Sequence, residues 1–225
     1  SIMPVPVLQE LAASLPALQL YNCYGQSEIA PLATVLRPEE HAERPASAGR
    51  PIFNVETRIV DSDLNDVPAG EMGEIVHRSP QLMSGYWDKP EETAASFRDG
   101  WFRSGDVGYL DEAGYLYITD RIKDIIKTGG VVVASREVEE CLYTHPAVAE
   151  VAVIGLPDER WIEAVTAVVA LKQGAQATAA ELIAHVHARL AAFKVPKRVF
   201  FVEDMPRNAS GKLLKRELRV RYAET

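Results

Sequence analysis

The alternation of apolar and polar residues predicts a β-rich first half of the chain. Residues 55–59 and 115–118 alternate with a period of two, and 74–76 form a short apolar run, patterns that are typical of β-strands. Turn sequences rich in glycine, aspartate and proline separate these runs. The pattern over residues 44–118 therefore predicts a small barrel or sandwich.

Two helices are expected in this first half. Residues 7–15 form a plausible helix that Pro16 ends, and Pro90 with the two glutamates after it begins a short helix that ends near Phe97.

Beyond residue 134, strand and helix patterns alternate. Ser135 can cap a helix that reaches Tyr143, and Thr178 with Glu181 forms a capping box for a helix that extends to about residue 190. Three strands and a last helix are expected at residues 148–154, 164–171, 198–202 and 213–221. Together they predict a compact α+β unit of about 100 residues, a common domain size.

The segment 120–130 joins the two regimes. Acidic and basic residues accompany isoleucines up to Lys127, and the run ends in Gly129 and Gly130. The charge pattern alone leaves three interpretations open: a hinge, the edge of a ligand site, or an exposed strand.

Composition narrows the class of protein. The 225 residues are 47% hydrophobic and 25% charged, which is ordinary for a soluble globular protein, and no apolar run approaches the length of a transmembrane helix. No secretion signal is visible, and the only two cysteines lack the spacing of a zinc site. The net charge of −8 disfavours nucleic-acid binding. Residues 194–221, however, hold nine basic and three acidic residues, which indicates either a small polyanionic ligand or a solvated helix face.

Three short motifs carry candidate chemistry. In the first, Tyr24 could lie against a planar base, the Ser27 hydroxyl could meet a phosphate and Glu28 could reach a hard cation. In the second, Asp106 follows a glycine turn and could accept hydrogen bonds from a ribose diol. In the third, Lys212 on an exposed loop could reach an anionic centre. Each motif alone is explained as well by a strand end or a turn cap.

In fixed order, these motifs and the joining segment resemble the core motifs of the adenylate-forming superfamily. That group includes acyl-CoA synthetases, firefly luciferase and the adenylation domains of peptide synthetases. The motifs lie at residues 24–28, 102–106, 120–124 and 206–212, so the likeness covers essentially the whole chain. Segments 84–87 and 151–158 look most like the fatty-acyl and aryl-CoA ligase branch.

The resemblance implies an AMP-forming carboxylate–CoA ligase. A fatty or aromatic acid would react with MgATP to give acyl-AMP, and CoA would then take the acyl group as a thioester. By motif position, Tyr24 would stack on adenine, Ser27 would contact phosphate and Glu28 would help to hold Mg²⁺ in the adenylation step. Asp106 would bind the ribose hydroxyls, and Arg121 would contact ribose or phosphate oxygens.

The remaining roles fall in the second half of the chain. Lys123 would be the hinge about which a C-terminal domain rotates, and Lys212 would bridge carboxylate and nucleotide during adenylation. The residues implied in CoA binding are Gly129, Gly130, Trp161 and Lys197. Similar ligases usually carry acidic and amide residues after the glycine pair, whereas this chain has valines at 131–133.

The resemblance also sets expectations for the organisation of the protein. The fold class is α/β and α+β multidomain: residues 1–120 are the remainder of a large AMP-binding domain with a barrel-like subdomain at about 44–120. A hinge follows at 121–124, and a small mobile α+β domain follows at 125–225. We interpret the chain as the C-terminal half of a longer cytoplasmic enzyme that alone is not competent in adenylation.

Three further possibilities accompany this interpretation. The chain could belong to an adenylation module that loads a carrier protein, or it could be a non-catalytic nucleotide-binding fragment. Lys212 also lies in a segment that resembles acetylated sequences of related ligases, so an acetyltransferase and a deacetylase are possible partners. Acetylation would remove the charge that adenylation needs.

Overall fold

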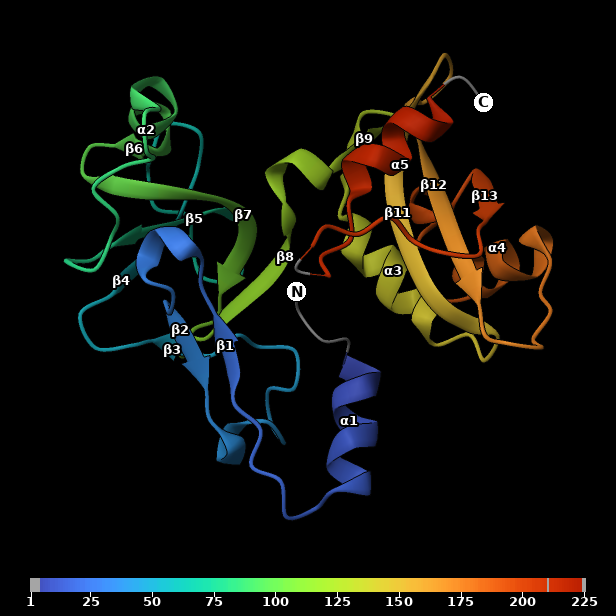
Figure 1. The fold of residues 1–225 in the computed structure, drawn as a ribbon, viewed down its shortest axis with the longest axis horizontal. Coiled ribbons are helices and arrows are strands. Elements are labelled where there is room, and N and C mark those ends of the chain that lie inside the picture. The colour runs from blue at the N-terminus through green and yellow to red at the C-terminus, as the bar shows by residue number, and fades with distance from the viewer. Residues whose placement is uncertain (1–4, 210, 224–225) are drawn as a thin grey trace. The chain divides into compact units, whose positions relative to one another are not determined.

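The structure, a computed structural model, describes residues 5–209 and 211–223. The chain forms two compact units, one spanning residues 7–122 and the other comprising residues 5–6 together with the chain from Lys123 onward. We call them the β-rich unit and the α+β unit (Figure 1). The functional division into a large domain, a hinge and a mobile domain stays a prediction.

The β-rich unit contains a small antiparallel sheet and a larger curled sheet. The small sheet has the order β1 (Asn22–Tyr24), β2 (Thr34–Leu36), β3 (Arg50–Pro51). The larger has the order β4 (Glu56–Val60), β5 (Gly73–Arg78), β7 (Trp101–Leu110), β6 (Phe97–Arg98), and β8 (Leu116–Arg121) also pairs with β7. The other elements described in this part are α1 (Val5–Ser14), α2 (Pro90–Ser96) and the 3₁₀ turns η1 (Ser27–Ile29) and η2 (Pro38–Glu40).

Side chains from both sheets share one core, to which Tyr24 of the first motif belongs. The backbones meet where Ala48 N–H donates to the Leu116 carbonyl at 2.7 Å and Leu116 N–H donates to the Gly49 carbonyl at 2.8 Å. The buried members of the core are Tyr24, Ile29, Ala33, Ala48, Val55, Ile59, Ile75 and Leu116.

Strand β7 differs from the expected turn around residue 105. Positions 102, 104, 106 and 108 are buried in alternation, so the segment is a true strand even though its inward residues include serine, aspartate and glycine. The ladder with β5 is interrupted: Val76 pairs with Arg103, but Glu74 pairs with Val107. The extra residues form a bulge, and Gly105 adopts a φ of +69° within it. Asp106 therefore lies in a bulged strand, which the missing apolar alternation concealed.

The α+β unit contains one mixed sheet with helices on both faces (Figure 1). Its order is β10 (Val131–Val133), β9 (Ile126–Thr128), β12 (Ile162–Leu171), β11 (Val148–Asp158), and β13 (Arg198–Phe201) lies parallel to β12. The helices are α3 (Ser135–Tyr143), α4 (Ala179–His187) and α5 (Lys215–Tyr222), and the 3₁₀ turns are η3 (Ile122–Asp124) and η4 (Ala192–Lys194).

The two faces of this sheet explain its continuous apolar strands. Val151, Val153 and Val165 pack in one cluster with Leu142 of α3 and Leu182 of α4. Alternate positions of the same strands, among them Ala152, Ile154 and Val168, pack with Leu218 of α5 in a second cluster. The sequence of a strand that is buried on both faces is an unbroken run of hydrophobic residues.

The structure settles several local predictions. The mixed α/β fold class is confirmed, and so is the capping box, because Thr178 Oγ1 accepts the Glu181 N–H and Glu181 accepts the Thr178 N–H. The Ser135 cap is wrong: Ala134 is the N-cap, while Ser135 lies inside α3 and its hydroxyl accepts a hydrogen bond from Lys215. Of the helices in the described part of the chain, none is long and apolar enough to cross a membrane.

Candidate functional site

Three sequence motifs converge on one buried carboxylate in the β-rich unit. Asp106 Oδ2 accepts hydrogen bonds from the Tyr24 hydroxyl and from Gln26 Nε2, both at 2.8 Å. Asp106 Oδ1 accepts one from Arg121 Nε at 2.9 Å. Tyr24 is on β1, Asp106 on β7 and Arg121 at the end of β8, so the sheets bring together residues that lie almost 100 positions apart.

The bulge in β7 orients the Asp106 carboxylate. The Ser104 hydroxyl donates to the Ile75 carbonyl at 2.6 Å and accepts the Asp106 N–H at 3.0 Å. Gln26 Nε2 also donates to the Ser104 carbonyl at 2.9 Å. Asp106 is thus fixed from both sides, with 7% of its surface exposed.

Tyr24 remains a hydrogen-bond donor because its phenol stays neutral. Burial, and then the negative charge of Asp106, raise the pKa of Tyr24 well above its usual range. Its ring is 9% exposed and lies 5.8 Å from the ring of His77, centroid to centroid. The expected stacking of adenine on Tyr24 stays a prediction.

His77 of β5 is a buried neutral imidazole behind this network. Burial lowers the pKa of His77 to about 4, although the charge of Asp106 acts in the opposite direction. Its Nδ1 lies 3.0 Å from Thr57 Oγ1, and its Nε2 has no hydrogen-bond partner among the described residues. Protonating this ring would bury a charge without a partner.

Glu28 lies in the 3₁₀ turn η1, directly after the Tyr24 strand. Its Oε1 accepts a hydrogen bond from the Tyr86 hydroxyl at 2.8 Å. The neighbouring Ser27 is exposed, as its expected contact with phosphate requires. Within the described residues, no group of three or more acidic, histidine or cysteine side chains could hold a metal ion without help from a ligand.

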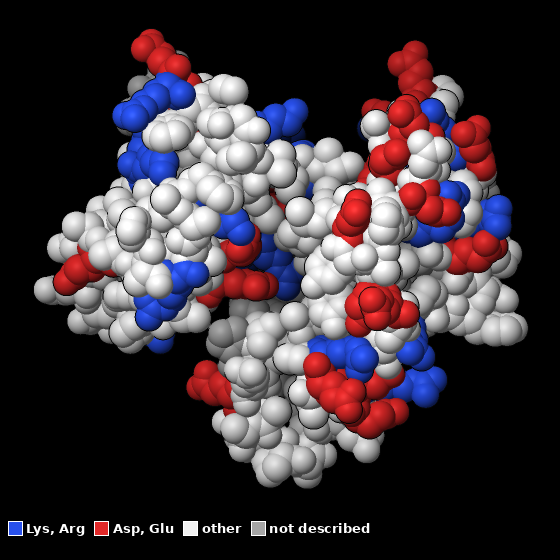
Figure 2. All heavy atoms as spheres, turned by 180° about the vertical axis from the view of Figure 1, so that it is seen from behind, with Lys and Arg blue, Asp and Glu red and all other residues white. Residues whose placement is uncertain are grey.

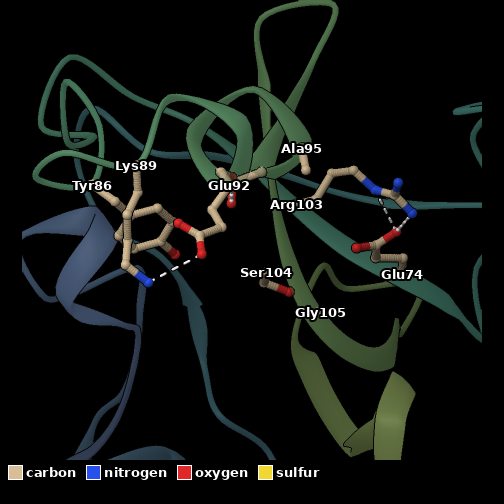
Figure 3. A pocket seen from close by; sticks show the side chains of 9 residues that line it. Glu74, Tyr86, Lys89, Glu92, Ala95, Arg103, Ser104 and Gly105 are labelled. Carbon is tan, nitrogen blue, oxygen red and sulfur yellow. Dashed lines mark hydrogen bonds and ion pairs between the residues drawn. The ribbon is translucent and has the colours of Figure 1, made fainter.

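A cavity of about 550 Å³ borders the motif at residues 102–106 and the segment 84–87 (Figure 3). Its wall includes Ser104 and Gly105 on one side and Tyr86 on another. The charged side chains of the wall pair with one another, Lys89 with Glu92 at 3.1 Å and Arg103 with Glu74. The cavity is therefore charge-balanced rather than a ready anion site, and its relevance lies in its position beside the motifs.

The residues predicted to bind CoA lie together in the α+β unit. Gly129 and Gly130 make the two-residue turn between β9 and β10, with φ values of +57° and +83°. Gly129 N–H donates to the Trp161 carbonyl at 2.8 Å. The Lys197 ammonium lies 5.0 Å from the centre of the Trp161 ring, and burial together with the charge of Arg160 lowers the pKa of Lys197.

Valines 131–133 follow this turn and form β10. Val131 and Val132 are exposed, whereas Val133 is fully buried in the core of the α+β unit. The departure from the family pattern therefore leaves the strand intact and removes polar side chains from its exposed positions.

Lys212 lies on a separate loop that is closed by its own hydrogen bonds. Asn208 Oδ1 accepts the Lys212 N–H at 2.8 Å, and Asn208 N–H donates to the Lys212 carbonyl at 3.0 Å. Arg207 donates to the Gly211 carbonyl at 2.7 Å and pairs with Glu150 on β11. The loop thereby holds an exposed lysine on a fixed backbone.

Lys123 is exposed in the turn η3, next to a buried acid. Asp124 pairs with Arg219 of α5 at 2.7 Å. Lys215 of α5 pairs with Glu139 of α3 at 2.7 Å. Helix α5 is thus bonded both to the turn beside Lys123 and to α3.

The charge of the C-terminal segment is largely internal. Five of its nine basic residues form ion pairs with acids from earlier parts of the α+β unit: Lys194–Glu137, Arg198–Asp158, Arg207–Glu150, Lys215–Glu139 and Arg219–Asp124. On the face shown in Figure 2, acidic and basic side chains are intermingled. Most of the predicted positive charge is therefore structural and forms neither a broad polyanion site nor a solvated face.

Three residues that contact the predicted ones carry no signal of their own in the sequence. Gln26 is an amide between Tyr24 and Glu28, which are stronger candidates. Tyr86 lies in the segment 84–87 and Asn208 in the loop 206–212, where neither residue type indicates a contact. The structure brings Tyr24, Asp106 and Arg121 together, and it groups Gly129, Trp161 and Lys197 separately.

Comparisons with known proteins identify the class. The family described as AMP-binding enzyme matches residues 1–87, and AMP-binding enzyme C-terminal domain matches residues 137–212. The chain belongs to this family of adenylate-forming enzymes.

Its relatives include aryl-CoA ligases. The chain is 46% identical over 219 residues to a feruloyl-CoA synthase from Amycolatopsis sp, covering 96% of this chain and 45% of that protein. It is 44% identical over 216 residues to a 2-succinylbenzoate–CoA ligase from Geobacillus kaustophilus, covering 96% and 44%. The solved structure of the o-succinylbenzoate CoA synthetase from Bacillus subtilis with ATP and magnesium ion matches with a TM-score of 0.87 and 36% identity, over 96% and 44% of the two chains. The chain thus spans less than half the length of these relatives.

Proposed function

We propose that the enzyme carrying this chain is an AMP-forming carboxylate–CoA ligase. A carboxylate oxygen of the substrate attacks the α-phosphorus of ATP, pyrophosphate leaves, and the CoA thiol then attacks the acyl carbon of acyl-AMP with release of AMP. The observation that carries the proposal is the convergence of three motifs on Asp106, with Tyr24, Gln26 and Arg121 bonded to it.

Hydrogen-bond capacity supports a nucleotide at Asp106. A carboxylate offers about four acceptor positions, and three are used by the neighbouring side chains. A ribose diol needs two, so one present partner has to move. Arg121 has 34% of its side chain exposed, whereas Tyr24 is buried. We infer that Arg121 leaves Asp106 on binding and contacts the nucleotide itself.

The residues around Glu28 fit a magnesium ion brought by ATP. Mg²⁺ keeps several waters and usually takes one or two protein carboxylates plus substrate phosphates. Glu28 supplies one half-exposed carboxylate, and its Oε2 has no partner among the described residues. When bound, the ion would neutralise phosphate charge as the substrate carboxylate approaches. Glu28 would hold one side of it.

Lys212 supplies a fixed positive charge for adenylation. Two anions, the substrate carboxylate and the α-phosphate, must approach each other, and a positioned ammonium offsets their repulsion in a water-poor site. The hydrogen-bonded loop of Asn208 supports this role because it fixes the lysine backbone before substrate arrives.

The second half-reaction uses the other cluster and the hinge. Lys123 changes its backbone angles between half-reactions, with residues 1–120 belonging to the large domain and 125–225 to the mobile one. The Gly129–Gly130 turn leaves room for the pantetheine arm, and Trp161 with Lys197 contacts the CoA nucleotide. The exposure of both glycines and the cation over the indole ring support this assignment.

The substrate is a fatty or aromatic carboxylic acid, in keeping with the relatives' names. We place the enzyme in the cytoplasm and propose Lys212 as an acetylation site. Intact-mass measurement before and after deacetylase treatment tests the latter.

The test uses the whole enzyme with a panel of carboxylates, MgATP and CoA. We expect the wild-type enzyme to form thioester and AMP only when a carboxylate is present. The Lys212→Ala variant should lose adenylation but still form the thioester from supplied acyl-AMP. Lys123→Pro should slow the second half-reaction more than the first. An unchanged adenylation rate in Lys212→Ala contradicts the lysine assignment. A thioester formed only on a phosphopantetheinylated carrier protein favours the carrier-loading alternative.

A further inference from the structure

The turn that carries Glu28 is too small to fix its own side chain. It comprises three residues, Ser27–Ile29, and ends at Ala30 in the left-handed conformation with φ of +53°. A single 3₁₀ turn makes few internal hydrogen bonds. Its geometry must therefore come from neighbouring parts of the chain.

Segment 81–86 provides that support through four hydrogen bonds. Gln81 Nε2 donates to the carbonyls of Ile29 and Leu32, both at 2.7 Å. Met83 N–H donates to the Glu28 carbonyl at 2.8 Å. The Tyr86 hydroxyl donates to Glu28 Oε1, also at 2.8 Å. The segment thus holds both the backbone of the turn and the carboxylate.

Tyr86 is itself fixed by helix α2. Its N–H donates to Thr93 Oγ1 at 2.9 Å, and that hydroxyl donates to the Lys89 carbonyl at 2.7 Å. Gly85 has a φ of +154°, and a Cβ there would meet Thr93 Cγ2 at 2.8 Å, so the chain approaches α2 closely. The phenol is positioned by a helix rather than by a free loop.

The Tyr86 hydroxyl is the donor in its bond with Glu28, and the carboxylate can only accept. The bond engages only Oε1, and Oε2 has no partner among the described residues. In metal sites, a hydrogen bond to a ligand that orients it often costs tenfold or more in affinity when it is removed.

We propose that Tyr86 is a positioning residue for the Glu28 carboxylate: it holds Oε1 so that Oε2 is presented to a divalent cation. This inference rests on the proposed function, in which Glu28 ligates the Mg²⁺ of MgATP. Tyr86 itself touches neither the cation nor the nucleotide.

The experiment measures Mg²⁺-dependent nucleotide binding by the whole enzyme, without a carboxylate so that no turnover occurs. The probe is a fluorescent ATP analogue followed by anisotropy, titrated with Mg²⁺ and separately in EDTA. For Tyr86→Phe we expect the half-saturating Mg²⁺ concentration to rise about tenfold, the lower end of such effects because Glu28 is half-exposed. Affinity in EDTA should stay unchanged, which a general folding defect would not allow.

Two further variants calibrate the result. Tyr117→Phe removes another phenol next to a carboxylate, 3.5 Å from Asp111, and should leave the Mg²⁺ dependence unchanged. Thr93→Val removes the hydroxyl that anchors the Tyr86 backbone and should give a smaller shift in the same direction as Tyr86→Phe.

Glu28→Gln distinguishes the metal-binding role of Glu28 from the positioning role of Tyr86. If Glu28→Gln shifts the Mg²⁺ dependence and Tyr86→Phe does not, the positioning role is wrong while the metal role of Glu28 stands. If neither shifts it, the proposed metal role fails and the inference fails with it. An equal loss of affinity for Tyr86→Phe in Mg²⁺ and in EDTA would show a structural role only.

Discussion

Lowering the pH should destabilise the β-rich unit through His77. The imidazole is 1% exposed and has a pKa of about 4 in the folded chain, against 6.5 for an unperturbed histidine. Because the folded pKa is the lower one, the unfolded state binds the proton first as the pH falls. The stabilising contribution of neutral His77 is complete above pH 6.5 and is lost progressively between pH 6.5 and 4.

The size of the effect follows from the two pKa values. At pH 5 the unfolded histidine is almost fully protonated and the folded one is not, which costs about 2 kcal/mol by linkage. The full difference between the two pKa values sets a ceiling of about 3.4 kcal/mol, which is approached well below pH 4. A loss of 2 kcal/mol is a large part of the stability of an ordinary domain.

Two measurements check this value. NMR of histidine-labelled protein should show an imidazole signal that does not titrate between pH 8 and 5, and that signal should disappear in His77→Gln. Urea denaturation followed by tryptophan fluorescence should show that wild type loses about 2 kcal/mol more than His77→Gln between pH 7 and 5. The two proteins differ only at position 77, so the difference between their pH dependences reports on His77.

Either of two results would refute the reasoning. An NMR pKa of 6 or higher for His77 would mean that water or a hydrogen bond reaches the buried Nε2. Equal pH dependence of wild type and His77→Gln would mean that the unfolded chain shifts the same pKa.

Three further predictions concern the α+β unit. Asn208→Ala removes the acceptor of the Lys212 N–H, and the lost hydrogen bond is worth about 1 kcal/mol. Single-turnover adenylation should therefore slow about fivefold. An unchanged rate would show that the loop keeps its conformation without this bond. Arg219→Met breaks the ion pair with the turn beside Lys123 and should slow adenylation about tenfold, whereas Arg216→Met, exposed on the same helix, should have no effect. Gly130→Ala should cost about 1 kcal/mol in urea denaturation, because φ is +83° and no neighbouring atom lies within 4 Å of the added Cβ. Asn at the same position should recover part of that loss, since it tolerates this conformation; a neutral Ala variant would contradict the backbone explanation.

The sequence was most informative where chemistry and local pattern coincide. The apolar runs at 148–154 and 164–171 predict strands β11 and β12, because both faces of that sheet are buried. The capping box of α4 is local and was therefore readable. Strand β7 was missed because its inward positions 104, 106 and 108 carry serine, aspartate and glycine, which serve the Asp106 network rather than a core.

Long-range pairing was beyond the sequence. The motif order indicated that Tyr24 and Asp106 serve one site, but their direct bond depends on how the two sheets meet. The hydrogen bond from Tyr86 to Glu28 spans 58 positions, and neither residue type predicts a contact with the other. The sequence indicated that the C-terminal basic residues were free to bind an anion, because their acidic partners lie up to 95 positions earlier in the chain.

Helix α5 connects the surroundings of Lys123 with those of Lys212, two residues that are 89 positions apart in the sequence. One end begins three residues after Lys212, and Arg219 near the other end is bonded to the residue beside Lys123. Leu218 is wholly buried between them, so the helix cannot slide on the sheet without exposing it. Under the proposed hinge role of Lys123, a rotation there would move the Lys212 loop together with α5, so the position of Lys212 would depend on the backbone angles at Lys123.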